Sequence, residues 1–165
     1  MLSRRRLHRY VSNRPTLADD PSGLVTVIPL PAANIHTLSD IDASCGVTVG
    51  GCNQVNYSVD WTGCEICDHT PHFTITLLGA IFVASGPFPY KGRSPADRSI
   101  VSTATALAHE QRHTDDKVNA IVPIFQRVEH HFDSQAECQD AAQEAASQAA
   151  AAWITASAES QRRRH

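Results

Sequence analysis

Two histidines four residues apart flank a glutamate in the segment His109-Glu110-Gln111-Arg112-His113. Residues at this spacing project side by side on a helix, so the two imidazole rings can bind one Zn²⁺ ion at about 2.0–2.1 Å each. Glu110 follows the first ligand directly and can reach a metal-bound water without binding the metal itself. The pattern predicts a metallopeptidase-type hydrolase in which Glu110 takes the proton from that water as the water attacks a carbonyl.

Catalytic zinc sites normally have three protein ligands, so one more must come from elsewhere in the chain. A metzincin-type third ligand would be a histidine at position 119, where this chain has Asn119, and this excludes the metzincin class. The side chains further along that could bind a metal are Glu129, His130, His131, Asp133, Glu137, Asp140, Glu144 and Glu159.

The expected pairing of two helices selects among these candidates. If the helices form an antiparallel hairpin that turns near Ser134, equal rise per residue places Glu159 opposite His109. Glu159 is therefore the predicted third ligand. If Pro123 ends the first helix instead, the turn moves, and the histidine pair at 130–131 comes opposite the second histidine of the motif.

The residues after about position 94 predict these two helices, at about 95–160, because glycine is absent and alanine is abundant. Ser94-Pro95 predicts the N-cap and first position of the helix that carries the motif. Apolar residues repeat at three- and four-residue steps across Pro123, which predicts a kink rather than a break. The capping box Ser134-Gln-Ala-Glu137 starts the second helix. Asp116 is expected either to hydrogen-bond a ligand histidine or to belong to a solvated helix face.

The first half of the chain predicts strands between about residues 24 and 85. Leu24–Ile28 is a short β-branched run that ends at prolines, and Val55–Trp61 alternates apolar and polar residues. Val47–Val49 predicts another short strand that stops at Gly50-Gly51, and a strand or hairpin is expected over His72–Val83. These elements predict an α+β fold, with a small N-terminal antiparallel sheet followed by a C-terminal two-helix hairpin that carries the motif.

Length and charge limit the domain organisation and the classes of partner. A chain of 165 residues fits one domain, expected over residues 21–165, and residues 1–20 are a basic arm that either lies over the domain or is disordered. A net charge of −3 gives no strong attraction for nucleic acid. The longest apolar stretch, Ile75–Ser85, is too short to span a membrane. A peptide or protein substrate is the expected partner.

Five cysteines is a high count for this length and suggests disulfides and an oxidising compartment. Cys45 and Cys52 enclose three glycines and are expected to pair across a hairpin. A second zinc site in the segment Cys64–His72 is the alternative use of the CxxC pair. The basic N-terminus is not followed by the apolar stretch of a signal peptide, so either export uses another route or the leader is missing from this sequence.

The order of these features resembles the bacterial domain-of-unknown-function family 922, regarded as secreted zinc-dependent proteases. A strand-rich half with cysteines is followed by a helix bearing Ala108-His-Glu-Gln-Arg-His-Thr-Asp-Asp116, and then by Cys138 at the start of an alanine-rich helix. The resemblance covers roughly residues 55–160, and only the HExxH helix is specific.

This resemblance implies that both histidines of the motif bind zinc, that Glu110 is catalytic, and that Cys138 pairs with Cys64 or Cys67. The chain departs from the family pattern at two places. Arg112 stands before the second histidine, where the family usually has glycine, and the family's C-terminal Tyr-Asp, Thr and His-Gly signature is absent.

Three functions follow from the sequence. The leading one is a secreted or otherwise extracytoplasmic zinc peptidase, and the second is a disulfide-stabilised zinc-binding interaction domain without turnover. The third is a polar helical hairpin that binds no metal.

Overall fold

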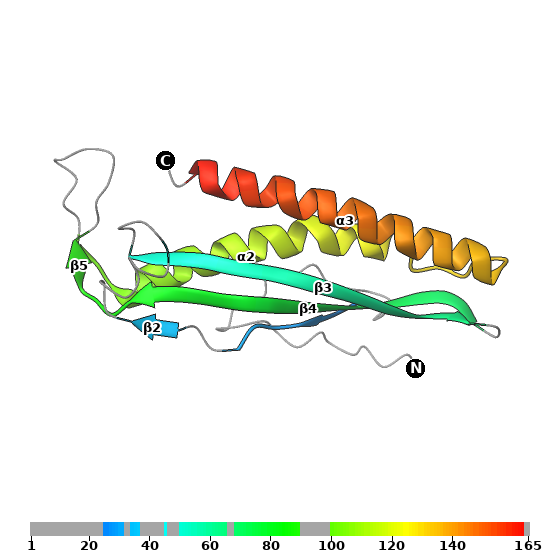
Figure 1. Cartoon of the computed structure of the whole chain (residues 1–165), viewed down its shortest axis with the longest axis horizontal. Helices are drawn as coiled ribbons and strands as arrows, with labels where there is room; N and C mark the ends of the chain where they lie inside the picture. The colour runs from blue at the N-terminus through cyan, green and yellow to red at the C-terminus, as the bar shows by residue number, and fades with distance from the viewer. Residues whose placement is uncertain are drawn as a thin grey trace, which may run out of the picture.

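A long β-hairpin covered on one face by two helices forms the frame of the protein (Figure 1). The computed structural model describes residues 25–31, 34–36, 45, 50–65, 68–89 and 100–163. The elements are β1 (Val25–Ile28), β2 (Asn34–His36), β3 (Gly51–Glu65), β4 (Asp68–Ala84), β5 (Phe88–Pro89), β6 (Ile100–Val101), α2 (Thr103–Gln126) and α3 (Gln135–Arg163). The predicted α+β class is confirmed, and the predicted basic arm lies outside the described residues.

The sheet is mixed, whereas the prediction was an antiparallel sheet. β3 pairs antiparallel with β4 along nearly its whole length, and β1 and β2 pair parallel with the other edge of β4. Val25 lies opposite Phe73 and Asn34 opposite Phe82, so the two short strands keep one register. They are separated by a segment with two prolines, which cannot donate backbone hydrogen bonds to a neighbouring strand.

The predicted strand over residues 55–61 lies within β3 and turns its apolar side chains toward the helices. Val55 is buried, and Tyr57 and Trp61 are half-buried against the core. Gly63 adopts a positive φ of 91°, and the pairing register shifts between residues 62 and 64. Side chains alternate along a strand, so this irregularity allows Cys64 to face the helices as well.

The helix that carries the motif begins later than predicted. α2 starts at Thr103, with Ser102 as its N-cap, and the Ser102 Oγ accepts a hydrogen bond of 3.1 Å from the Thr105 amide. Ser94-Pro95 therefore does not cap this helix, and both residues lie outside the described part of the chain. The β-branched pair Ile100–Val101 explains the difference, because it forms the short strand β6 against β5.

Pro123 lies inside α2, as predicted, and the helix ends three residues later at Gln126. The predicted start of the second helix is also confirmed, because the Ser134 Oγ accepts a hydrogen bond of 3.2 Å from the Glu137 amide. α3 then runs to Arg163, beyond the predicted end near residue 160. The connection between the helices is non-helical, and the Phe132 amide donates to the His69 carbonyl at the tip of the β3–β4 hairpin.

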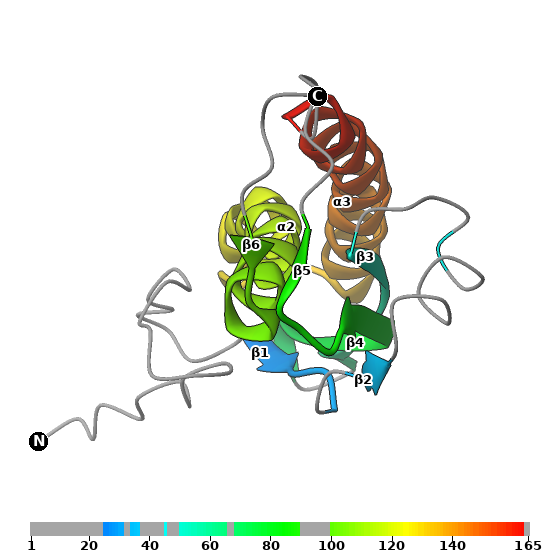
Figure 2. The same cartoon turned by 90° about the vertical axis from the view of Figure 1, so that its left-hand side faces the viewer.

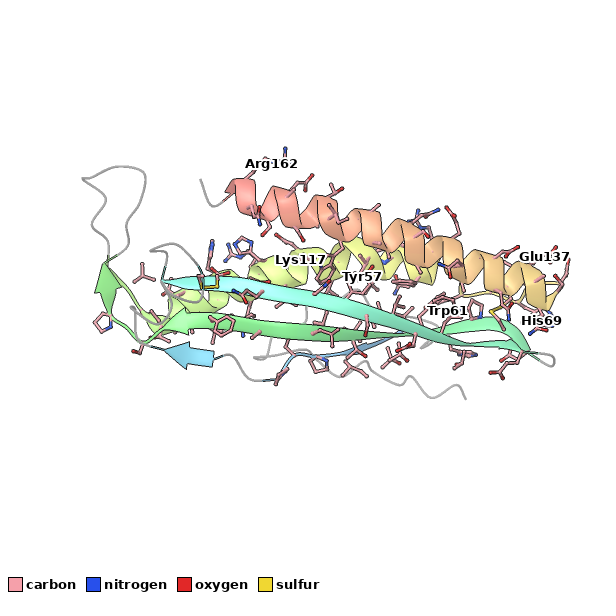
Figure 3. The ribbon with its side chains drawn as sticks, viewed as in Figure 1. Tyr57, Trp61, His69, Lys117, Glu137 and Arg162 are labelled. Atoms are coloured by element: carbon pink, nitrogen blue, oxygen red, sulfur yellow. A yellow bond between two sulfur atoms is a disulfide. The ribbon has the colours of Figure 1, made fainter. Side chains whose placement is uncertain are left out.

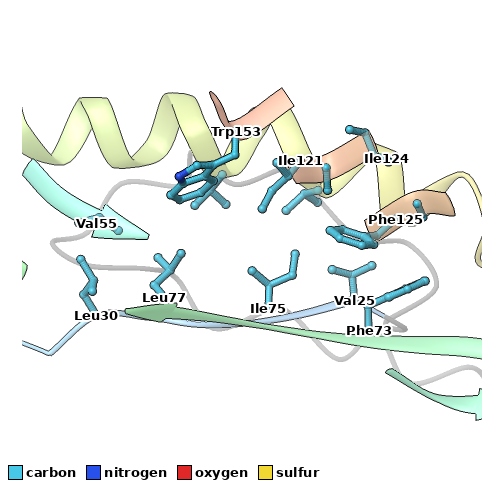
Figure 4. Close-up of a cluster of buried hydrophobic side chains, with 14 of the residues drawn as sticks. Val25, Leu30, Val55, Phe73, Ile75, Leu77, Ile121, Ile124, Phe125 and Trp153 are labelled. Atoms are coloured by element: carbon cyan, nitrogen blue, oxygen red, sulfur yellow. The ribbon is translucent and has the colours of Figure 1, made fainter. Parts of the chain in front are cut away.

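The hydrophobic core lies between the sheet and the paired helices, which are side by side in the end view of Figure 2. Figure 4 shows strand residues facing helix residues across this layer. Phe73 and Phe125 are both fully buried, and their ring centroids are 4.7 Å apart. Small side chains of α3 let it approach its neighbours closely; the buried alanines are Ala142, Ala145 and Ala149.

Two disulfides, Cys45–Cys52 and Cys64–Cys138, link parts of the chain that the sequence predicted to pair. The alternative prediction, a second zinc site in the segment Cys64–His72, is wrong for Cys64, because its sulfur forms the disulfide with Cys138 of α3. Cys67 lies outside the described residues. Structural disulfides are typical of oxidising compartments. No helix in the described part of the chain is both long and apolar enough to cross a membrane.

Candidate metal centre

The two histidines of the motif converge on one point beside α2. Their Nε2 atoms are 3.0 Å apart, and their rings meet edge to face. One ligand atom from each of His109, Glu110 and His113 lies within 4.8 Å of the others. Two nitrogens bound to one tetrahedral zinc ion at about 2.0–2.1 Å are separated by roughly 3.3 Å, so small ring movements would fit them to an ion. These three residues could hold a metal ion.

The candidate site has a buried side and an exposed side. Glu110 and His113 are only 4% and 5% exposed, whereas His109 is exposed. Glu110 lies over the first residue of β3, since a Cβ added to Gly51 would lie 3.3 Å from the Glu110 Cγ. The absence of a side chain at Gly51 thus leaves room for the glutamate, and ligands from solvent can approach from the His109 side.

His113 is also bound from the second helix. Its Nδ1 lies 2.5 Å from the Ser160 Oγ, and both side chains are buried. The sequence did not predict this contact, because only carboxylates and histidines were candidate ligands on the second helix. The signal that could have found it is a small hydroxyl residue near the place where the second helix passes the motif.

The same contact shows that the register of the helical hairpin differs from the predicted one by about one turn. Equal rise per residue had placed Glu159 opposite His109, but residue 160 meets His113. The non-helical connection accounts for the shift, because it advances further per residue than a helix and starts α3 beyond the end of α2. Glu159 is exposed and is not one of the three converging residues, so its role as a ligand stays a prediction.

The alternative ligands at 130–131 do not approach the motif. They were expected there only if Pro123 ended the first helix, and α2 continues past that proline. His131 stacks on His69 near the hairpin tip, the end of the molecule opposite Arg162 in Figure 3. The thirteen helical steps from His113 to Gln126 alone span roughly 20 Å.

A hydrogen-bonded network fixes the motif helix to β3. The Asn53 Nδ2 donates to the backbone carbonyl of Glu110 at 2.7 Å and to the Thr114 Oγ1 at 2.6 Å. Asn53 Oδ1 accepts from the buried ammonium of Lys117 at 2.8 Å, and this ammonium also lies 5.4 Å from the ring centroid of Trp153. Figure 3 shows Lys117 between the helices and β3. Sequence reasoning predicted none of these hydrogen bonds and did not single out Asn53 or Lys117.

The aspartate pair after the motif is partly buried. Burial, and to a smaller extent the charge of Asp116, raises the pKa of Asp115 above its usual value. Asp116 is half-buried, and its predicted hydrogen bond to a ligand histidine stays a prediction.

Comparison with protein-family models, with curated proteins and with solved structures finds no match for this chain. The resemblance to family 922 therefore stays a proposal, and the candidate site rests on its own geometry.

Proposed function

We propose that this protein is a zinc-dependent peptide hydrolase. The observation that supports this function is the convergence of His109 and His113 from one helix, with the carboxylate of Glu110 beside them. Two imidazoles and a carboxylate suit zinc, and HExxH is the arrangement in which one helix supplies both metal ligands and the catalytic base.

In this mechanism the zinc ion would polarise the scissile carbonyl and lower the pKa of the attacking water. Glu110 takes the proton from that water on its carboxylate and then passes the proton to the leaving amine. The Glu110 side chain is buried beside Gly51, and its carboxylate lies within 4.8 Å of ligand nitrogens of the two histidines, where it can reach a water bound at the site. His109 and His113 hold the ion, and His109 faces the side open to a peptide.

We further propose a third metal ligand and a location for the protein. Glu159 is the third ligand in this proposal, since the residue after it contacts His113 and the last turns of α3 therefore lie beside the motif. The protein acts outside the cytoplasm, as the two disulfides and the resemblance to family 922 suggest.

Zinc content and peptide hydrolysis, measured on the same samples, test this function. Protein purified without added metal should contain about one zinc ion per chain by elemental analysis. Glu110→Gln should keep the zinc but lose hydrolysis of a broad peptide library by a factor of at least about 10². Glu144→Gln is the matched control, because this glutamate is exposed on α3, where its carboxylate accepts a hydrogen bond from the Gln148 side chain.

The outcomes separate the three functions. Zinc binding without hydrolysis by the wild type would support the interaction domain, and absence of zinc would contradict both zinc functions. Glu159→Ala should lower the zinc content in the same measurement. An unchanged zinc affinity in that variant would remove Glu159 from the ligand set and leave the roles of the two histidines intact.

A further inference from the structure

The hydroxyl of Ser160 makes a polar contact from α3 to a histidine of the motif. Ser160 and His113 lie 47 residues apart in the sequence, yet the Oγ and Nδ1 atoms are 2.5 Å apart and both side chains are almost fully buried. The opposite nitrogen of the same ring, Nε2, is the one that points toward His109. Ser160 therefore contacts the far side of a candidate ligand.

The chemistry of a metal-bound imidazole determines which way this hydrogen bond must run. A ring that binds a metal through Nε2 carries its proton on Nδ1, and that N–H requires an acceptor to fix the orientation of the ring. The Ser160 Oγ is such an acceptor. We propose that Ser160 is a positioning residue for the metal ligand His113, so that the last turns of α3 complete the metal centre. This inference rests on the proposed function only in requiring that the site binds zinc.

The same hydrogen bond prepares the site before an ion arrives. The Nε2 atoms of His109 and His113 lie 3.0 Å apart, so one of them carries the proton between them. With the His113 proton held on Nδ1 by Ser160, the shared proton belongs to His109. His113 thus presents its lone pair toward the metal position in the metal-free protein, and only His109 has to give up its Nε2 proton on binding.

Zinc affinity of Ser160→Ala tests the proposal by competition with a chromophoric zinc chelator. Loss of an outer-shell partner of a ligand histidine typically weakens metal binding by about 10–100-fold, and we expect a loss in that range. Ser157→Ala is the matched control, since the Ser157 hydroxyl donates to the Trp153 carbonyl within α3. It should bind zinc like the wild type. Ser160→Thr keeps a hydroxyl and should restore most of the affinity.

Nitrogen-15 NMR of the His113 ring gives a second measurement, one that a merely structural role of Ser160 would not affect. In metal-free wild-type protein the proton should be on Nδ1, and in Ser160→Ala this preference should weaken. A wild-type ring protonated on Nε2 alone would overturn the proposal even if the alanine variant fails to fold.

The affinity measurement separates this inference from the hydrolase function. If Ser160→Ala binds zinc as tightly as Ser157→Ala, the positioning role is wrong although the zinc site stands. If the wild type binds zinc and shows the expected affinity series but hydrolyses no peptide, the positioning role stands and the hydrolase function fails. A wild type that binds no zinc overturns both.

Discussion

The contact between Asn53 and the buried ammonium of Lys117 allows a quantitative test of how the motif helix is held. Asn53→Ala removes one hydrogen bond to a charged group, worth about 1.5–3 kcal/mol, and two bonds to neutral acceptors, worth about 0.5–1.5 kcal/mol each. It also removes the 2.8 Å hydrogen bond that the buried Lys117 ammonium donates to Asn53. We therefore expect the free energy of unfolding to fall by at least about 3 kcal/mol.

Replacing the charged partner should have a smaller effect. Lys117→Met keeps most of the aliphatic volume next to the Trp153 ring and removes the ammonium that must be desolvated, so we expect the free energy of unfolding to change by no more than about 1 kcal/mol. The double variant Asn53→Ala/Lys117→Met should then be more stable than Asn53→Ala alone, by about 1 kcal/mol or more.

Urea unfolding followed by circular dichroism, with the disulfides intact, measures these free energies. Asn56→Ala is the control, because that side chain is exposed and its Oδ1 accepts a local hydrogen bond from the Tyr57 amide. It should change the stability by no more than about 0.5 kcal/mol. A loss below about 1 kcal/mol for Asn53→Ala, or a double variant less stable than Asn53→Ala, would refute the proposed role of the buried charge.

The remaining predictions concern the disulfides and the aspartate after the motif. Removing the Cys64–Cys138 disulfide, whose residues are separated by 74 positions, should cost about 4 kcal/mol by loop entropy, against about 2 kcal/mol for Cys45–Cys52; equal losses in urea unfolding would contradict this. Burial, and to a smaller extent the neighbouring aspartate, raise the pKa of Asp115, so the folded protein binds a proton on this carboxyl more tightly than the unfolded chain does. The contribution of Asp115 to stability therefore falls as the pH rises above 3.8. Asp115→Asn should therefore melt at a higher temperature than metal-free wild type at neutral pH, and the gain should shrink toward pH 3.8; parallel melting profiles would exclude this.

Local patterns in the sequence predicted the longer strands and the two helices, but not the short strands β2, β5 and β6. Helical spacing placed His109 and His113 side by side, and the capping residues at Ser134–Glu137 marked the start of the second helix. These features depend on residues only a few positions apart, so no knowledge of the tertiary structure was needed. The start of α2 was predicted too early. Residues 100–101 pair with β5 as the short strand β6, and Ser102 then caps the helix.

The register between distant elements was decided by the tertiary structure alone. The sequence contains Glu159 and Ser160 side by side, but which of them meets His113 depends on how far the non-helical connection carries the chain before α3 begins. The bonds from Asn53 to the motif helix likewise require β3 and α2 to pack in one alignment. By itself the sequence determined a helix able to offer two imidazoles and a carboxylate. Packing of α3 and β3 against that helix decided which hydroxyl and which amide hold it, because contacts across an interface depend on register and not on residue spacing.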